Sequence, residues 1–78
     1  SAKSFNQGPY AFSAAPYGED GFKLTLKLDA SLFSAQRAGA PDDETLRAAA
    51  AAAAPDGCSL KSVERTETGE AIADYDCA

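Results

Sequence analysis

Residues 58–77 read CSLKSVERTETGEAIADYDC, and they predict more of the architecture than any other part of this chain. The run Thr66-Glu67-Thr68-Gly69 is dense in turn formers, so the flanking residues can fold back as a β-hairpin. This places Cys58 and Cys77 opposite each other, or one residue out of register. Facing Cβ atoms lie about 4.5–5.5 Å apart, within adjustment range of a disulfide. The sequence therefore predicts a Cys58–Cys77 disulfide, with two buried free thiols as the alternative.

The two halves of this hairpin differ in how regularly their apolar residues alternate. In residues 71–77, apolar side chains at alternate positions share one face, as in a half-buried strand. In the first half, Cys58 and Leu60 stand at even-numbered positions and so share one face of a regular strand. Val63 stands at an odd-numbered position and would lie on the other face. One extra residue in a strand shifts the parity in this way, so we expect a β-bulge near Ser62.

A helix is expected immediately before the hairpin. Residues 41–44 read PDDE, which combines a proline tolerated in a first helical turn with carboxylates that favour the positive end of the helix dipole. The helix continues through an alanine tract to about Ala54, where the sequence PDG at residues 55–57 ends it. Because Leu46 is its only large apolar residue, the helix must lie close to the sheet, with small alanine side chains at the contact.

Two strands are expected in the N-terminal half. Residues 9–14 alternate in polarity, and a proline at the start suits an edge strand, where no ladder N–H is needed. Residues 22–28, FKLTLKL, alternate strictly and predict a half-buried strand, preceded by a hairpin loop at residues 17–21. Residues 1–8 are predicted to be a flexible lead-in. Residues 29–39 fit either a longer strand or a short helix capped by Asp29.

Together these elements predict a single α+β domain over residues 9–78, with the order β-β-α-β-β. The expected architecture has two layers, with one alanine-rich helix packed on a mixed four-stranded sheet. A right-handed crossover through the helix would set the strand that begins at Cys58 parallel to the strand at residues 22–28. A domain near 78 residues buries only about 60% of its unfolded surface, so the disulfide should supply a large share of its stability.

The charge balance argues against two kinds of partner. The chain has 12 acidic and 7 basic residues, a net charge of −5, and its Lys and Arg residues do not cluster into a stripe. A chain of this sign repels phosphate backbones and anionic membrane surfaces. Its apolar runs are also far shorter than the roughly 18–20 residues that span a bilayer.

The residue types do not support catalysis or a metal or cofactor site. Histidine and the C-x-x-C spacing are both absent, and neither cysteine has a basic neighbour that would activate it. The carboxylates at residues 42–44 and Asp56 lack the spacing and the glycine of a calcium loop, and the first three compensate a helix N-terminus. We therefore expect a non-enzymatic protein with no cofactor and no metal.

Two strands carry charged residues on the face expected to be solvated. Lys23 and Lys27 alternate with apolar residues in one strand, and Asp74 and Asp76 do so in another. If these strands are neighbours, the four side chains form cross-strand ion pairs. A catalytic pair of carboxylates would need a pocket that separates their pKa values, and a solvated face does not provide one.

Cysteine usage and composition indicate export. Disulfides persist in oxidising compartments. The chain contains no methionine, which fits cleavage of a leader before Ser1, with removal of an initiator methionine in the cytosol as the alternative. The alanine-rich composition is typical of a bacterium with a GC-rich genome, so we expect a periplasmic, extracellular or cell-surface location.

Aromatic residues give the one positive indication of function. The chain has 3 tyrosines and 4 phenylalanines, more rings than a slim helix on a small sheet can easily cover. We expect Tyr10, Tyr17 and Phe33 to be exposed, as aromatic residues at protein-binding surfaces are. The predicted function is a non-enzymatic, exported module that binds another protein, as an accessory subunit of a bacterial envelope or surface assembly. The alternative is a secreted inhibitor of a protease or other hydrolase that presents a loop at residues 29–40 or 17–21.

Overall fold

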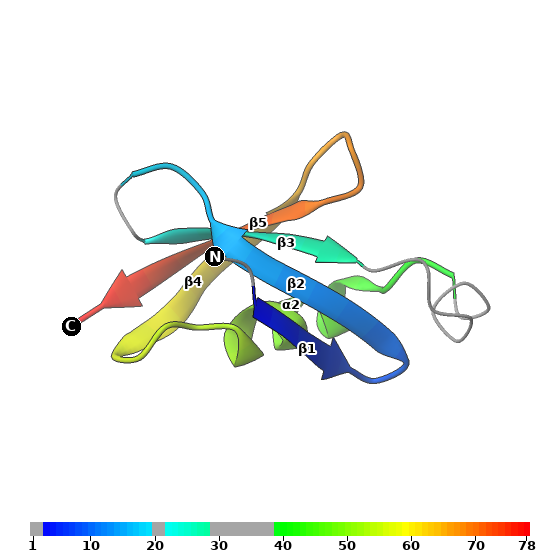
Figure 1. Ribbon diagram of the computed structural model, residues 1–78, viewed down its shortest axis with the longest axis horizontal. Helices are drawn as coiled ribbons and strands as arrows, with labels where there is room; N and C mark the ends of the chain where they lie inside the picture. Colours follow the sequence, from blue (N-terminus) through cyan, green and yellow to red (C-terminus); the bar gives the residue numbers. More distant parts are fainter. Residues whose placement is uncertain (1–2, 20–21, 29–38) are drawn as a thin grey trace.

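Five antiparallel strands and one helix form the regular structure of the described residues, which are 3–19, 22–28 and 39–78 of this computed structural model (Figure 1). In chain order the elements are β1 (Lys3–Gln7), β2 (Tyr10–Pro16), β3 (Lys23–Leu28), α2 (Asp43–Ala52), β4 (Cys58–Arg65) and β5 (Ala71–Cys77). The expected helix and the four expected strands are confirmed within two residues of their bounds. The alternatives for residues 29–39 lie outside the described residues, except for Gly39.

The expected mixed four-stranded sheet is wrong. The sheet has five strands in the order β1-β2-β3-β5-β4, and every neighbouring pair is antiparallel. Strand β5 lies between β3 and β4, so the two strands on either side of the helix in sequence are not neighbours. The buried residues Ala71, Ala73 and Tyr75 explain why β5 is the inner strand of its hairpin, whereas β4 is largely exposed and takes the edge.

The fifth strand, β1, falls within the segment expected to be a flexible lead-in. It pairs with β2 through a two-residue turn at Gly8–Pro9. Gly8 has a φ of 61°, the left-handed conformation that such a hairpin turn requires at its first central position. Pro9 therefore serves the turn, and the expectation that β2 is an edge strand is wrong because β1 covers it.

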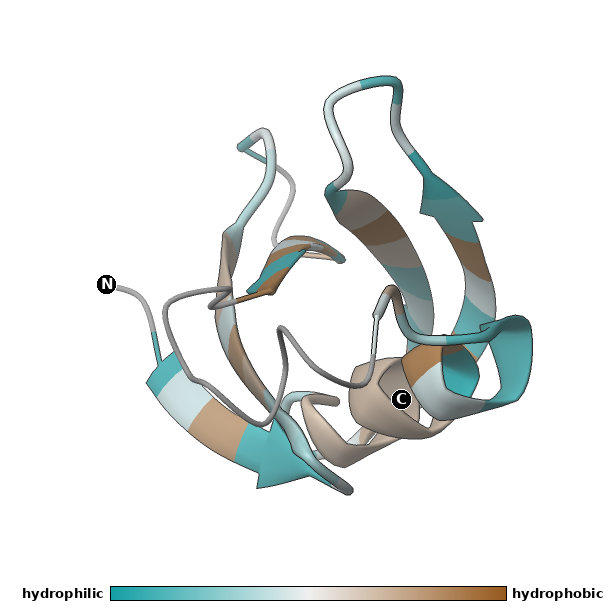
Figure 2. Ribbon diagram, turned by 90° about the vertical axis from the view of Figure 1, so that its right-hand side faces the viewer, coloured by the Kyte–Doolittle hydropathy of each residue, from teal (hydrophilic) through white to brown (hydrophobic). Residues whose placement is uncertain are grey.

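The sheet is strongly curved, and α2 lies in the opening between its two edge strands (Figure 2). The helix contacts both β1 and β4. We call the side of the sheet that faces α2 the inner face; its buried residues include Phe12 and Leu26. The opposite side, which includes Ser13 and Thr25, is the outer face.

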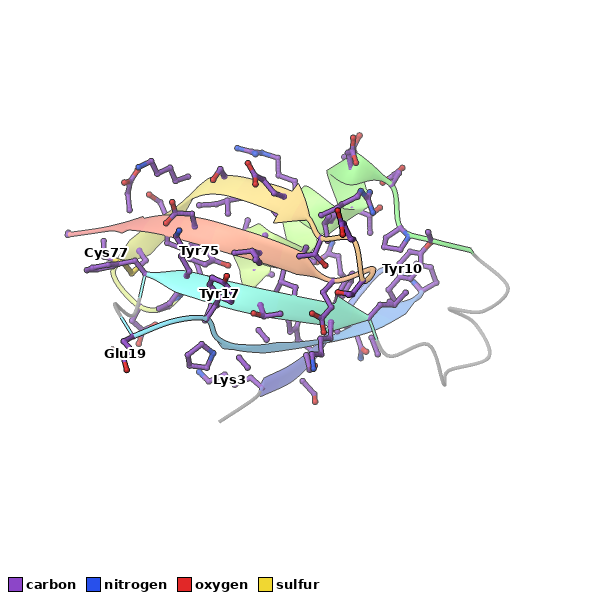
Figure 3. The ribbon with its side chains drawn as sticks, turned by 90° about the horizontal axis from the view of Figure 1, so that it is seen from above. Lys3, Tyr10, Tyr17, Glu19, Tyr75 and Cys77 are labelled. Carbon is purple, nitrogen blue, oxygen red and sulfur yellow. A yellow bond between two sulfur atoms is a disulfide. The ribbon has the colours of Figure 1, made fainter. Side chains whose placement is uncertain are left out.

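Small side chains allow α2 to fit inside this curve, as the alanine tract predicted. Ala49 and Ala50 are fully buried, and side chains from β2, β3 and β5 fill the space between helix and sheet (Figure 3). The buried core residues are Tyr10, Phe12, Ala14, Leu26, Leu46, Ala49, Ala50, Ala71, Ala73 and Tyr75.

Both ends of α2 are held by side chains. At the N-terminus the Asp42 carboxylate accepts a hydrogen bond from the Thr45 backbone N–H at 2.8 Å, and this bond keeps the pKa of Asp42 below its ordinary value. Near the C-terminus the backbone N–H of Ala54 bonds to the Ala51 oxygen, and the Tyr75 hydroxyl donates to the Ala50 oxygen at 2.7 Å. The tyrosine thus satisfies a carbonyl that the end of the helix would leave without its usual partner.

Tyr75 also makes stability sensitive to alkaline pH. Burial raises the pKa of Tyr75 to about 12, whereas an unfolded tyrosine ionises near pH 10. Above about pH 10 the unfolded chain therefore binds fewer protons than the native protein, and stability falls as the pH rises to about 12. We expect urea unfolding to show this loss in the unmodified protein and a weaker pH dependence in Tyr75→Phe. If the free energy of unfolding falls equally with pH in the two proteins, the loss of stability does not come from Tyr75.

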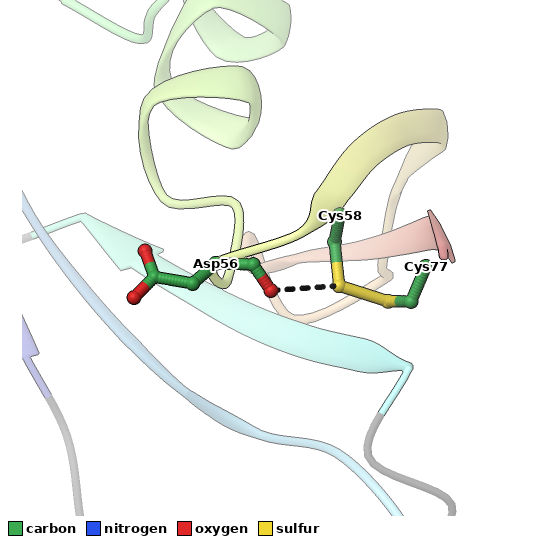
Figure 4. The surroundings of a disulfide bond; sticks show 3 residues. All are labelled: Asp56, Cys58 and Cys77. Carbon is green, nitrogen blue, oxygen red and sulfur yellow. Dashed lines mark hydrogen bonds between the residues drawn. A yellow bond between two sulfur atoms is a disulfide. The ribbon is translucent and has the colours of Figure 1, made fainter.

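The predicted disulfide and bulge are both confirmed. Cys58 and Cys77 are directly opposite in the β4–β5 pair and form a disulfide (Figure 4). The Cys58 sulfur lies 3.8 Å from the Asp56 carbonyl oxygen in the loop that follows α2. The register of the pair shifts between Leu60 and Ser62, so Lys61 is the extra residue of the bulge.

Candidate partner-binding surface

The three aromatic residues expected on the surface have different outcomes. Tyr17 is 47% exposed, but Tyr10 is only 7% exposed, so the expected exposure of Tyr10 is wrong. Tyr10 lies on the inner face next to Phe12, with ring centroids 6.2 Å apart, at the far end of the sheet from Tyr17 (Figure 3). Phe33 lies outside the described residues.

Phe22 is a second exposed aromatic residue, although the alternation of residues 22–28 predicted that it begins a half-buried strand. It is 48% exposed and immediately precedes the first residue of β3. The backbone N–H of Tyr17 bonds to the Lys23 oxygen, and the N–H of Tyr75 bonds to the Phe22 oxygen, each at 2.9 Å. Because side chains alternate along paired strands, Tyr17 and Phe22 belong to opposite faces and do not form one patch.

The charged residues of the outer face form one cross-strand ion pair among the described residues, and it is not one of those predicted. Strands β3 and β5 are neighbours, as the predicted ion pairs required, and Lys23 is opposite Asp74. Lys27 forms an ion pair with Glu70 at 3.3 Å. A solvated pair of this kind contributes little to stability. The outer face therefore has the properties of an ordinary solvated surface.

The β4 edge of the sheet is protected against pairing with another chain. The bulge at Lys61 interrupts its regular ladder, and a charged residue stands at the interruption. The Arg65 guanidinium links this edge to the start of α2, donating to the Pro41 carbonyl at 2.9 Å and to the Asp43 carboxylate at 2.8 Å. These are the features by which natural sheets prevent edge-to-edge association.

The β1 edge has neither a bulge nor a proline. Gln7 and Tyr10 flank the two-residue turn, which makes them a hydrogen-bonded pair. Since bonded and non-bonded pairs alternate in an antiparallel ladder, Ser4 and Asn6 direct their backbone N–H and C=O groups away from β2. Among the described residues, no strand pairs with this outer edge.

A groove runs beside this edge, between β1 and the C-terminal end of α2. It consists of two hollows of about 170 and 260 Å³, both lined by Lys3, Ala14, Ala53 and Ala54. The smaller hollow also reaches Phe5, and the larger also reaches Leu24, Pro55 and Asp56. We call this the β1–α2 groove.

Most of the side chains that line the β1–α2 groove are small and apolar, although about half of its exposed surface is polar. Phe5 is half-buried there and stacks on Phe12, with ring centroids 5.7 Å apart. The helix wall is built from alanine residues. Lys3 is the one cation among the lining residues, and Asp56 at the far end is the one anion.

The remaining side chains of the described residues do not form a reactive site. In this part of the chain there is no group of three or more His, Cys, Asp or Glu residues placed to hold a metal ion. Its buried polar side-chain atoms all have hydrogen-bond partners. None of its helices is long and apolar enough to cross a membrane.

Comparisons with known proteins give no relative: no family model, no curated protein and no solved structure matches this chain.

Proposed function

We propose that this protein is a non-enzymatic, exported module that binds another protein, as an accessory subunit of a bacterial envelope or surface assembly. The observation that carries the proposal is the β1 edge, with which no strand of the described residues pairs, beside a groove lined mostly by small apolar side chains. Outward-facing backbone donors and acceptors beside small apolar side chains complement a polypeptide better than they complement a small polar metabolite.

Export is supported by the disulfide. The Cys58–Cys77 bond closes the open end of the β4–β5 hairpin and is compatible with an oxidising compartment. A small domain in a reducing cytosol would lose this bond to thiol exchange. The periplasm and the cell surface are therefore the proposed locations.

The proposal of a non-enzymatic role is supported by the ionisable groups. Asp42 and Tyr75 have clearly shifted pKa values, and both shifts arise from structural contacts at the ends of α2. Active sites usually gather perturbed groups in one cleft. These two residues cap opposite ends of a helix instead.

Site-specific photo-crosslinking in the producing cell tests the proposed function. A photoreactive residue at Asn6, on the β1 edge, should form one dominant adduct with another protein of the envelope. The same residue at Glu67, in the exposed β4–β5 turn, is the matched control and should give none. The absence of a protein adduct from Asn6, with the labelled protein folded and present in the envelope, would contradict the proposal.

Inhibition of a hydrolase remains the second candidate, because Tyr17 is exposed in the β2–β3 loop. An inhibitor presents such a loop on a rigid scaffold, and β2 and β3 are paired up to Pro16 and Leu24. Assays against proteases and lysozymes should then show inhibition that Tyr17→Ala weakens. Equal inhibition by both proteins, or none at micromolar concentration, would remove this candidate.

A further inference from the structure

We infer that the β1 edge binds an extended segment of a partner protein as an additional strand. Small apolar side chains of this segment occupy the β1–α2 groove, and an acidic residue lies near Lys3. The inference rests on the proposed function, and it specifies the chemistry of the partner and its mode of binding.

The backbone of β1 determines what kind of ligand fits. Ser4 and Asn6 each present one N–H donor and one C=O acceptor along the outer edge. The spacing of these groups matches the alternating bonds of an antiparallel ladder. Only another extended backbone offers donors and acceptors with the same repeat, so the edge selects a strand rather than a helix.

The side chains then place the ligand over the groove. The ligand residue opposite Phe5 forms a non-hydrogen-bonded pair with it, because the backbone groups of Phe5 point to β2. The side chain of this ligand residue points to the same face as Phe5. That is the inner face, where Ala53 and Ala54 form the opposite wall of the groove. A ligand residue two positions along lies about 6.6 Å away, so it can reach the second hollow.

The size and charge of the groove limit the sequence of the segment. Hollows of about 170 and 260 Å³ with alanine walls suit side chains such as valine or leucine at alternate positions. Lys3 is the one cation that lines both hollows. A carboxylate of the ligand can pair with it at the rim, and this contact should weaken as salt is added.

A second copy of this chain does not fit the groove. A strand that binds at the β1 edge must place side chains from one of its faces in the groove. The Phe5 side chain of a second copy is not free to do so, because it is stacked on Phe12 of the same copy. The second β1 is also in contact with its own α2. Two copies would each carry a net charge of −5, which disfavours association further. A free extended segment of another protein meets none of these obstacles.

The decisive variant is Ser4→Pro, with Ser4→Ala as its matched control. Proline removes the outward N–H of Ser4, which does not bond to β2, and proline is tolerated at sheet edges. The probes are peptides selected on the unmodified protein from a display library of short random sequences, with affinity measured by fluorescence polarisation. We expect Ser4→Pro to weaken binding by about tenfold or more, and Ser4→Ala to change it by less than about twofold.

Amide hydrogen exchange supplies the independent measurement. A bound peptide should slow exchange at Ser4 and Asn6, while Lys61 on the opposite edge is unchanged. If Ser4→Pro does not fold, peptides N-methylated at alternate amides are tested on the unmodified protein. One methylation pattern should abolish binding and the other should preserve it, because only one set of amides faces β1.

Three results would overturn the inference. One is a selected peptide that binds Ser4→Pro as well as Ser4→Ala and is insensitive to N-methylation. Another is a dimer of the unmodified protein, seen by light scattering, that Ser4→Pro dissociates, because a second copy would then occupy the edge. Failure of the selection to yield any binding peptide is the third. After the first or the third result, an adduct of Asn6 with another envelope protein would still support the proposed function, so the two failures are distinguishable.

Discussion

Replacing both Cys58 and Cys77 by alanine will lower the free energy of unfolding by about 3 kcal/mol. The two cysteines are 19 positions apart in sequence, and the bond removes conformational freedom from the unfolded chain by an amount that grows with the logarithm of the loop length. A total stability of about 5–15 kcal/mol is usual for a domain, so the loss is a large fraction. For a chain of this size it corresponds to a fall in Tm of roughly 12–24 °C.

Urea unfolding followed by circular dichroism measures this effect. The matched control is the double variant Ser59→Ala and Asp76→Ala, because these exposed residues form the next cross-strand pair in the same hairpin. The control should change stability by no more than about 0.5 kcal/mol. Equal stability of the cysteine variant and its control would show that the bond does not hold the fold together.

The disulfide should also affect partner binding. The Cys58 backbone N–H bonds to the Pro55 oxygen at 3.0 Å, and the Ala78 N–H bonds to the Gly57 oxygen at 3.0 Å. The disulfide, together with these two hydrogen bonds, thus fixes the segment that carries Pro55 and Asp56. Both residues line the far end of the β1–α2 groove. Because the groove depends on this segment, we expect reduction of the bond to weaken a bound strand before the sheet itself unfolds.

Local patterns explain why the C-terminal half could be predicted from the sequence. The parity break at Val63 shows the bulge without reference to any other part of the chain. Likewise, Asp42 caps the start of α2 and Pro55 stands shortly after its end, so backbone chemistry confined to a few residues indicates the limits of the helix. The cysteine pair adds the one long-range constraint that the sequence displays directly.

The order of the strands could not be predicted in the same way. The placement of β5 between β3 and β4 depends on which faces are buried in three dimensions. The sequence of β1, KSFNQ, contains one large apolar residue, so its pattern resembles a polar tail. It forms a strand because Phe5 stacks on Phe12 across the tight turn at Gly8–Pro9, a contact that only the paired structure displays.

The candidate surface was harder to predict than the fold. Tyr10 and Phe22 have similar alternating contexts, yet one is buried and the other exposed, a difference that the alternation alone does not show. The β1–α2 groove has no sequence signal of its own. Its walls come from the start of the chain and from the end of the alanine tract, and only the curvature of the sheet brings them together.

The same curvature makes the alanine tract intolerant of larger residues. Ala50→Leu should destabilise the protein by about 3 kcal/mol, at the upper end of the usual cost of overpacking. Ala50 is fully buried, and the Tyr75 hydroxyl bonds to its carbonyl oxygen from the sheet side. A longer side chain must push α2 away from the sheet. That movement would break the tyrosine hydrogen bond and separate the helix from both edge strands.

Ala51→Leu is the matched control, since Ala51 is the exposed neighbour on the same helix and the substitution is identical. Alanine and leucine have similar helix propensities, so any difference between the two variants reports packing alone. The control should remain within about 0.5 kcal/mol of the unmodified protein in urea unfolding. If both variants unfold at the same urea concentration, the helix does not need alanine to fill the opening of the sheet. The β1–α2 groove would then be deformable enough to accept larger side chains than valine or leucine.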